Sequence, residues 1–401
     1  MNNYLDKFNF EWEGLDNNLE LLCSNTYEGN DSKDFVKVKL PSFVASYGLE
    51  DNVLIFPKKF VKSNSDKDKE VDYKSCNWIK AADYLSKLEF EKNSIKNNLF
   101  SISGKKISDE IYKIAYVNRY LLFLRDLKAY NENRKELIGK VVQPKIYLTH
   151  DVDSIKVSFF LKLRQFLNNF SWPKLKYNEN LNLIKKITEI ENKFQVSSIF
   201  FFSGLDKKLN LPLVDPNYKL NDLDETFKHL ITNGNQIGLH PGLLSSFFSR
   251  ILKFEILSLE RFVENNISLV RNHWLSIYKN KTWKIQSKNN VLYDFSTGFN
   301  NIPGFRNFCS LEYSPINNLK IIPMIIMDGQ FYNYLKTDKE KIMDVVKPYI
   351  KEVKNVGGVA SINFHQRFFH EFYSYESTYQ ELLEYLKEED LLWIKKLSTK
   401  I

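Results

Sequence analysis

Residues 145–153 have the sequence Lys-Ile-Tyr-Leu-Thr-His-Asp-Val-Asp, in which a short apolar run ends in a group of ionisable side chains. The apolar run predicts a buried strand that leaves the core at Thr149. Because side chains alternate along a strand, we expect Thr149, Asp151 and Asp153 on one face and His150 on the other. Two carboxylates in one small volume should raise one of the two pKa values unless a cation intervenes, which suits a general base or a metal site. An Asp-rich turn that caps the next segment is the alternative interpretation.

From residue 145 onward, short apolar runs alternate with amphipathic segments. Strands are expected near 196–202, 236–240, 321–327, 359–364 and 391–394, and helices near 181–190, 223–231, 252–262, 339–353 and 375–387. Repeated strand–helix units predict a parallel sheet, and about seven of them favour a distorted (β/α) barrel of the α/β class over an open sheet. Barrels carry their chemistry at the carboxyl ends of strands. The residues expected to meet at one mouth are Asp151, Asp153, His240, Asp328 and His365.

Residues 1–140 are expected to form a smaller α+β accessory domain, separate from a barrel domain over 144–401. The expected elements are strands at 36–41 and 53–57, a charged loop at 63–70, and helices over 78–88 and 111–127. No group of residues in this part has an evident chemical use. Its role is therefore open between substrate binding, dimerisation and packing.

The composition is that of a globular protein with a sizeable core, because 43% of the 401 residues are hydrophobic and 15% are aromatic. Lys and Arg number 57 against 49 Asp and Glu, but the net charge of +8 is spread along the chain, which disfavours a nucleic-acid partner. Cys23, Cys76 and Cys309 lie far apart, so neither a disulfide framework nor a thiolate zinc site is indicated. With no signal-peptide pattern and no apolar run near the roughly 18 residues that span a bilayer, a cytoplasmic protein is expected.

Five short motifs follow one another along the second part of the chain. They are Thr149-His-Asp-Val-Asp153, Gly238-Leu-His-Pro241, Gly304-Phe-Arg306, Met327-Asp328 and Asn363-Phe-His365. In this order they resemble the polysaccharide deacetylases, the NodB-like carbohydrate esterases that remove N-acetyl or O-acetyl groups from sugars. The resemblance covers roughly residues 144–396. Arg271-Asn-His273 and the run 365–371 are similar to a divergent branch of that family, which carries His-Asp-Val-Asp and is found in surface-glycan contexts.

The resemblance implies a divalent metal, with zinc as the expected ion, and a role for each motif. Asp151 is then the general base and Asp153 a metal ligand, although the reverse assignment stays open. His240 is implied as a ligand and His365 as the general acid. Arg306 is implied as the residue that orients the base, through a pair with Asp151 or Asp328.

One position departs from the family pattern. The usual second motif has another histidine one helical turn after the first, and here that position is Leu244, which cannot bind a metal. Asp153 and His240 supply only two protein ligands, whereas catalytic zinc generally takes three. The candidates for the third ligand are His273, which the branch motif favours, and His150 or His370.

The expected function is a metal-dependent hydrolase that removes an acyl group, N-acetyl above all, from an amino sugar or glycan precursor in surface-polysaccharide biosynthesis. Asp328 either takes part in catalysis or caps the following helix. Expected at the substrate are Arg271, Trp274, Phe305 and Arg367. Two alternatives stay open: a catalytically silent glycan-binding or scaffold protein on the same barrel, which Leu244 favours, and a metal-assisted glycosidase. The oligomeric state is left open.

Overall fold

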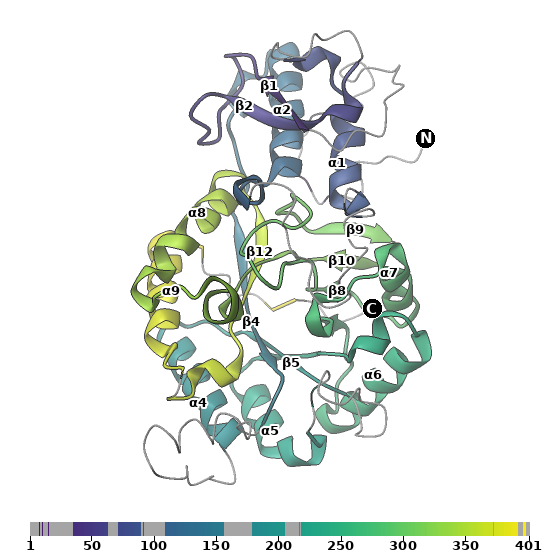
Figure 1. Cartoon of the computed structure of the whole chain (residues 1–401), viewed down its shortest axis with the longest axis vertical. Coiled ribbons are helices and arrows are strands. Elements are labelled where there is room, and N and C mark those ends of the chain that lie inside the picture. The colour runs from purple at the N-terminus through teal and green to yellow at the C-terminus, as the bar shows by residue number, and fades with distance from the viewer. Residues whose placement is uncertain are drawn as a thin grey trace.

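The computed structural model describes residues 8, 10, 15, 35–62, 71–89, 91, 109–155, 179–204, 216, 218–316, 318–371, 373–391 and 396–397. Its N-terminal part contains a small sheet of β1 (Phe35–Lys39), β2 (Val53–Pro57) and β3 (Val71–Asp72), in which β2 is antiparallel and β3 parallel to β1. Helices α1 (Trp78–Ser86) and α2 (Tyr116–Asn131) pack against each other beside it, at the top of Figure 1. The predicted strands are confirmed, whereas the helix expected over 111–127 begins only at Tyr116.

The larger part is a nine-stranded sheet that curls inside a layer of helices. Its order is β11-β12-β4-β5-β6-β7-β8-β10-β9, and every neighbouring pair is parallel except β9 with β10. The strands are β4 (Lys145–Val152), β5 (Ile199–Phe202), β6 (Gln236–Leu239), β7 (Leu269–Val270), β8 (Tyr293–Asp294), β9 (Tyr313–Ile316), β10 (Leu319–Ile321), β11 (Met324–Met327) and β12 (Val359–Asn363). The helices are α4 (Glu179–Lys193), α5 (Asp224–Thr232), α6 (Ser249–Val263), α7 (Lys279–Lys288), α8 (Ile342–Asn355) and α9 (Glu376–Glu388) (Figure 1). The predicted α/β class with a distorted parallel barrel and a smaller sheet is confirmed.

The strand expected over 321–327 is in fact two strands, separated by Ile322 and Pro323. β10 and β11 stand near opposite ends of the sheet order, although only these two residues lie between them. The Ile322 N–H donates to the Asp294 carbonyl at 2.9 Å, and the Pro323 carbonyl accepts from the Ser361 N–H at 2.7 Å. The chain therefore passes here from β10, the last strand but one at one end of the sheet order, to β11 at the other end. Pro323 suits this break because proline has no N–H to donate to a strand ladder.

β4 runs through the middle of the sheet and shows the predicted alternation. Thr149 and Asp151 both contact Arg271 on the inner face of the curl. The His150 ring lies on the other face, where it stacks on Phe200 with ring centres 4.6 Å apart. This alternation follows from the extended backbone, which continues to Val152.

The N-terminal part and the barrel share one continuous apolar cluster, which includes Val38 and Trp78 from the first and Ile146 and Ile362 from the second. A division into two domains near residue 140 remains a prediction. Three other expectations fall outside the described residues: the loop at 63–70, residues 392–394 of the last expected strand, and Cys23. Within the described ranges, no helix combines the length and apolar character needed to cross a membrane.

Candidate metal centre and active site

Asp153, His240 and His273 bring their ligand atoms together just after the carboxyl ends of β4, β6 and β7. These atoms all lie within 4.8 Å of one another. Asp153 Oδ1 is 3.1 Å from His240 Nε2 and 3.9 Å from His273 Nε2. Bonds of about 2.0–2.2 Å to a tetrahedral zinc ion would place neighbouring ligand atoms about 3–3.5 Å apart. The three residues predicted as ligands are therefore close enough to share one ion.

The hydrogen bonds around this group leave two of its ligand atoms, His240 Nε2 and Asp153 Oδ1, with lone pairs that a cation can accept. His240 Nδ1 lies 2.6 Å from the Arg271 carbonyl, to which it donates, so the neutral ring keeps its lone pair on Nε2. Asp153 Oδ1 is buried and accepts no hydrogen bond from the described residues. One carboxylate oxygen and two imidazole nitrogens form a donor set typical of zinc, so the residues present fit such an ion.

The position of the missing family histidine lies in a short 3-10 segment, Leu243–Ser246, where Leu244 has no ligand atom. His273 comes instead from the loop after β7. The two other candidate ligands do not belong to the group. His150 is bound on the far side of β4, with Nε2 3.0 Å from Glu191 and Nδ1 2.6 Å from a backbone carbonyl. His370 follows Gln366–Phe369 and lies outside the group of ligand atoms.

Asp151 is a buried carboxylate with a fixed orientation. Its Oδ1 accepts a hydrogen bond from Arg271 at 3.1 Å, and its Oδ2 accepts one from Asn363 at 2.8 Å. Burial by itself would raise the pKa of Asp151, but the positive charge of Arg271, followed by those of His240 and His365, brings this pKa below its usual range. The carboxylate is therefore ionised at neutral pH.

Arg271 was expected at the substrate, and that expectation is wrong. The side chain is fully buried at the end of β7, where it also donates to Thr149 Oγ1 at 2.7 Å and to the Phe295 carbonyl at 3.1 Å. Its guanidinium carbon lies 4.8 Å from the centre of the Phe201 ring. Arg271 therefore lies behind Asp151 and holds it in place.

The predicted pairing of Arg306 with Asp151 or Asp328 is also wrong. The buried guanidinium of Arg306 forms two hydrogen bonds of 3.0 and 3.1 Å with the carboxylate of Glu91. Its remaining nitrogen donates to two backbone carbonyls at 3.2 and 3.3 Å. Arg306 thus joins the barrel to the N-terminal part, and Arg271 occupies the place beside Asp151.

The backbone around Gly304 explains this outcome. Gly304 has φ +143, which a residue with a side chain rarely adopts, and its N–H donates to the Ile325 carbonyl at 2.8 Å. The next N–H, that of Phe305, donates to the Tyr112 carbonyl at 2.9 Å. The segment is therefore fixed against the N-terminal part. Phe305 is fully buried in the apolar cluster, so its expected contact with substrate is wrong as well.

His365 and Asp328 form a second polar group opposite the metal centre. Asp328 Oδ1 accepts from His365 Nδ1 and Asp328 Oδ2 accepts from the His365 backbone N–H, both at 2.6 Å. His365 Nε2 then faces Asp153, at 3.4 Å from Oδ2. Asp328 also accepts the Gly329 N–H, but its main partner is His365, so the helix-cap interpretation accounts for only part of its contacts.

Arg367 lies beside His365 and pairs with Asp153 through Oδ2. This contact leaves Oδ1 directed at the two histidines. Burial would raise the pKa of Asp153, but Arg367, and then the histidines His365, His240 and His273, bring this pKa well below its usual range. Burial would lower the pKa of His240, and the nearby Asp151 and Asp153 raise it. The negative charge of the site thus favours a cation here, whether a proton or a metal ion.

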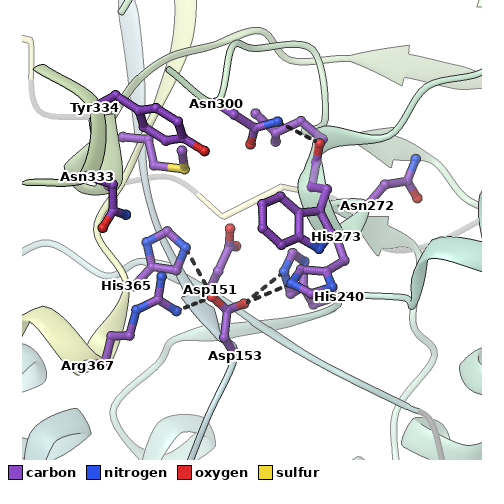
Figure 2. Close-up of a pocket in the computed structure, with 14 residues that line it drawn as sticks. Asp151, Asp153, His240, Asn272, His273, Asn300, Asn333, Tyr334, His365 and Arg367 are labelled. Atoms are coloured by element: carbon purple, nitrogen blue, oxygen red, sulfur yellow. Dashed lines mark hydrogen bonds and ion pairs between the residues drawn. The ribbon is translucent and has the colours of Figure 1, made fainter. Parts of the chain in front are cut away.

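One open pocket of about 320 Å³ is lined by the three residues of the metal centre and by Asp151, His365 and Arg367. Figure 2 shows His365, Arg367, Asn333 and Tyr334 on one side, His240, His273, Asn272 and Asn300 on the other, and the two aspartates between them. Trp274, expected at the substrate, lies on the rim with 37% of its surface exposed. Its backbone has φ 58, and its carbonyl accepts from Asn300 Nδ2 at 2.9 Å.

The amide and phenol groups of the pocket were not predicted from the sequence. These are Asn272, Asn300, Asn333 and Tyr334. Asn272 lies inside the Arg-Asn-His motif, so its place could have been inferred from its neighbours. Asn333 and Tyr334 belong to a π-helical turn, Gln330–Leu335, for which the sequence has no signal.

Searches against protein-family profiles and against curated proteins find no match to this chain. Among solved structures, the chain is similar to a protein assigned as a polysaccharide deacetylase, from Mycobacterium smegmatis, at 14% identity and a TM-score of 0.42, over 65% of this chain and 98% of that one. It is similar to a family 4 carbohydrate esterase from Streptomyces lividans at 9% identity and a TM-score of 0.37, over 65% and 95%. A family 4 pseudoenzyme from Bacillus anthracis follows at 12% identity and a TM-score of 0.35, over 62% and 63%.

Proposed function

We propose that this protein is a metal-dependent deacylase that hydrolyses the N-acyl group of an amino sugar. One observation carries the proposal: the Asp153–His240–His273 group and the His365–Asp328 pair face each other across a single pocket, with Asp151 at its base. A cation site, an ionised carboxylate and a held imidazole are the three parts that metal-assisted amide hydrolysis requires.

Asp153, His240 and His273 would hold the ion, which we propose to be zinc. When bound, such an ion supplies Lewis acidity at the acyl carbonyl. Asp151 is kept ionised by Arg271. Its oxygens accept hydrogen bonds from Arg271 and Asn363, and because a carboxylate oxygen has a second lone pair, Asp151 can still take a proton from the attacking water. As the C–N bond breaks, His365 Nε2 gives a proton to the departing amine. Asp328 stabilises the charged imidazole through Nδ1.

The lining of the pocket supports a sugar as substrate. Amide groups of Asn272, Asn300 and Asn333 and the Tyr334 side chain line it, and such groups can hydrogen-bond to ring hydroxyls. Trp274 offers a partly exposed aromatic face at the rim. A role in surface-polysaccharide biosynthesis and membership of the His-Asp-Val-Asp branch rest on the motifs alone and are part of the proposal.

The test begins with the metal content of the purified chain and with acetate release from N-acetylated amino-sugar oligomers. We expect zinc close to one ion per chain and turnover that a chelator abolishes and zinc restores. His273→Ala should lose both metal and turnover. Asp151→Asn should keep the metal and lose turnover by a factor of about 10² or more. Leu244→Ala is the matched control, because that side chain carries no ligand atom, and it should retain both.

Other outcomes identify the alternatives. Release of reducing sugar without acetate would mean a glycosidase. Stoichiometric zinc with sugar binding but no acetate release from any acylated sugar would mean a silent glycan-binding protein. Full metal content in His273→Ala would remove the third ligand from the proposal, and full turnover in Asp151→Asn would remove its base.

A further inference from the structure

Helices α6 and α7 carry an exposed surface that the pocket does not use. On α6, the exposed side chains recur at intervals of three and four residues, which places them along one side of the helix. α7 lies against α6 and adds further exposed cations. The surface, here called the α6–α7 face, consists of Phe248, Arg250, Lys253, Phe254, Leu257, Arg261, Tyr278, Lys281, Lys284 and Lys288.

The charge of the α6–α7 face is of one sign. The two acidic residues of α6 are used elsewhere: Glu255 is fully buried and accepts from the Gly242 N–H at 3.2 Å, and Glu260 accepts from the Ile267 N–H at 3.0 Å. α7 contains no Asp or Glu in its sequence. Within Ser249–Val263 and the described side chains of Lys279–Lys288, the exposed charges are therefore all positive, and the exposed acid Glu264 lies just beyond the end of α6.

Large apolar side chains stand among these cations. Phe248 is 54% exposed, Phe254 43%, and Leu257 and Tyr278 44% each. Phe254 and Leu257 follow Arg250 and Lys253 by one helical turn, so apolar and basic side chains alternate along the helix. Phe248, which directly precedes the first residue of α6, belongs to the same set of exposed apolar side chains.

The two helices are joined where this surface begins. Asn289, just past α7, donates to Ser249 Oγ at 2.9 Å, and the rings of Phe247 and Tyr278 lie 5.5 Å apart. A shallow hollow of about 460 Å³ forms here. Its lining consists of Phe247, Phe248, Ser249, Arg250, Lys253, Lys288 and Asn289. The cations of α6 and α7 thus border one depression beside an exposed phenylalanine.

We infer that the α6–α7 face docks on a lipid bilayer that contains anionic headgroups. Basic side chains are attracted to lipid phosphates, and a phenylalanine and a leucine on the same helix face can enter the boundary between headgroups and acyl chains. A nucleic acid would also attract the cations, and its bases could stack on the aromatic rings. It offers no apolar phase for the aliphatic Leu257, so the composition of the face favours the bilayer.

The metal centre and this face are connected along the chain. The segment after His240 passes through Leu243–Ser246 to Phe248, and the segment after His273 reaches Tyr278. Both ligand-bearing loops therefore lead directly into the α6–α7 face. A bilayer bound there would lie close to these loops.

The experiment is sedimentation of the full chain with vesicles of phosphatidylcholine alone and with vesicles containing equal parts of phosphatidylcholine and phosphatidylglycerol. We expect binding to the anionic vesicles only. Lys253→Gln/Lys284→Gln/Lys288→Gln should weaken it by about 100-fold, since each basic residue near the surface contributes about fivefold. Phe254→Ser/Leu257→Ser keeps every charge and should weaken binding by about tenfold or more.

Lys228→Gln/Ile231→Ser on α5 is the matched control, because it removes one exposed cation and one exposed large apolar side chain elsewhere. It should bind as the unchanged chain does, and circular dichroism should give all variants one melting temperature. Equal binding to both kinds of vesicle would overturn the inference. So would binding to single-stranded DNA but not to vesicles, or vesicle binding that survives loss of Phe254 and Leu257. None of these outcomes depends on deacylase activity.

Discussion

Asp328 holds His365 through two contacts that a carboxylate can accept together, one from the ring and one from the backbone. In Asp328→Asn one oxygen becomes an NH₂ group. This group cannot accept a hydrogen bond, so one of the two contacts with His365 would be lost. We therefore expect the turnover number to fall by about 10²–10⁴-fold, with metal content and KM close to those of the unchanged protein. Steady-state deacylation kinetics and metal analysis measure these quantities.

Asp338→Asn is the control for this change, because its carboxylate is exposed and pairs only with the surface residue Lys341 among the contacts of the described chain. It should leave the turnover number unaltered. An Asp328→Asn variant with full turnover would show that His365 needs no carboxylate behind it.

For single residues, the sequence predicts which side chains stand at the ends of strands, but it does not predict which side chains they contact. Asp153, His240 and His365 meet in the pocket because parallel strands deliver their carboxyl ends to one side of a sheet. The partner of Arg306 could not be inferred, since Glu91 lies in a distant segment without a motif. Arg271 was assigned to the substrate because a motif gives its spacing but not its burial.

β6 can approach its neighbours only because residue 238 is glycine. A Cβ there would lie 2.5 Å from Phe201 Cε1 and 3.0 Å from the Leu269 carbonyl. Phe201 is fully buried beside Phe295, so it has no free space to enter. We expect Gly238→Ala to lower the free energy of unfolding by about 1–3 kcal/mol and to weaken metal binding, because His240 lies two residues further on. Urea denaturation and zinc titration measure the two effects.

Gly329→Ala is the matched control, because its Cβ would meet nothing closer than 3.4 Å, the Asn333 Nδ2 atom. Its unfolding free energy should change by less than about 1 kcal/mol. If Gly238→Ala proved as harmless as Gly329→Ala, close strand packing would not be what fixes His240.

The barrel helices α4, α5, α6, α8 and α9 were predicted with nearly their observed bounds, whereas α7 and the shortest strands were not predicted. β7 and β8 have two residues each, too few for any alternation to be visible. The apolar run over 321–327 looked like one strand because apolar character does not reveal where the chain changes its neighbours. Pro323 was the local sign of that break.

The N-terminal part is joined to the barrel by buried ion pairs as well as by apolar contacts. Glu352 of α8 accepts from Arg119 Nε at 2.9 Å and from the Ala115 N–H at 3.0 Å. Glu352→Gln would leave a buried guanidinium without its counter-charge, so we expect a loss of about 3–5 kcal/mol in the free energy of unfolding. Urea denaturation gives this value.

The control is Glu389→Gln, which removes one partner of the exposed pair with Lys354 and should cost no more than about 1 kcal/mol. Equal effects of the two changes would mean that the contact between α2 and α8 adds little to stability.

Stability should also depend on pH through Asp126 of α2. Burial raises the pKa of this carboxyl, although hydrogen bonds from Tyr47 at 2.7 Å and from the Ala45 N–H at 3.1 Å oppose the rise. A raised pKa in the folded state means that the folded protein binds this proton more tightly than the unfolded chain does. The resulting contribution is complete below the unfolded pKa of about 3.9 and is lost as pH rises through the folded pKa.

We therefore expect the free energy of unfolding of the unchanged protein, minus that of Asp126→Asn, to fall as pH rises from about 4 toward neutrality. Urea denaturation of both proteins across this pH range measures it, and Asp344→Asn on α8 is the control. If this difference instead rose with pH, the pKa of Asp126 would be lowered by folding and not raised.

The replacement of a second-motif histidine by Leu244, with His273 in its stead, changes what an ion would do for the chain itself. If both histidine ligands lay one helical turn apart, a bound ion would connect Asp153 to only one other segment of the chain. Ligands at 153, 240 and 273 would tie three separate points, so one bound ion would act as a cross-link that closes two long loops. Closing such loops removes conformational entropy from the unfolded chain. Loss of the ion would then loosen the whole run from β4 to β7, together with the helices between these strands.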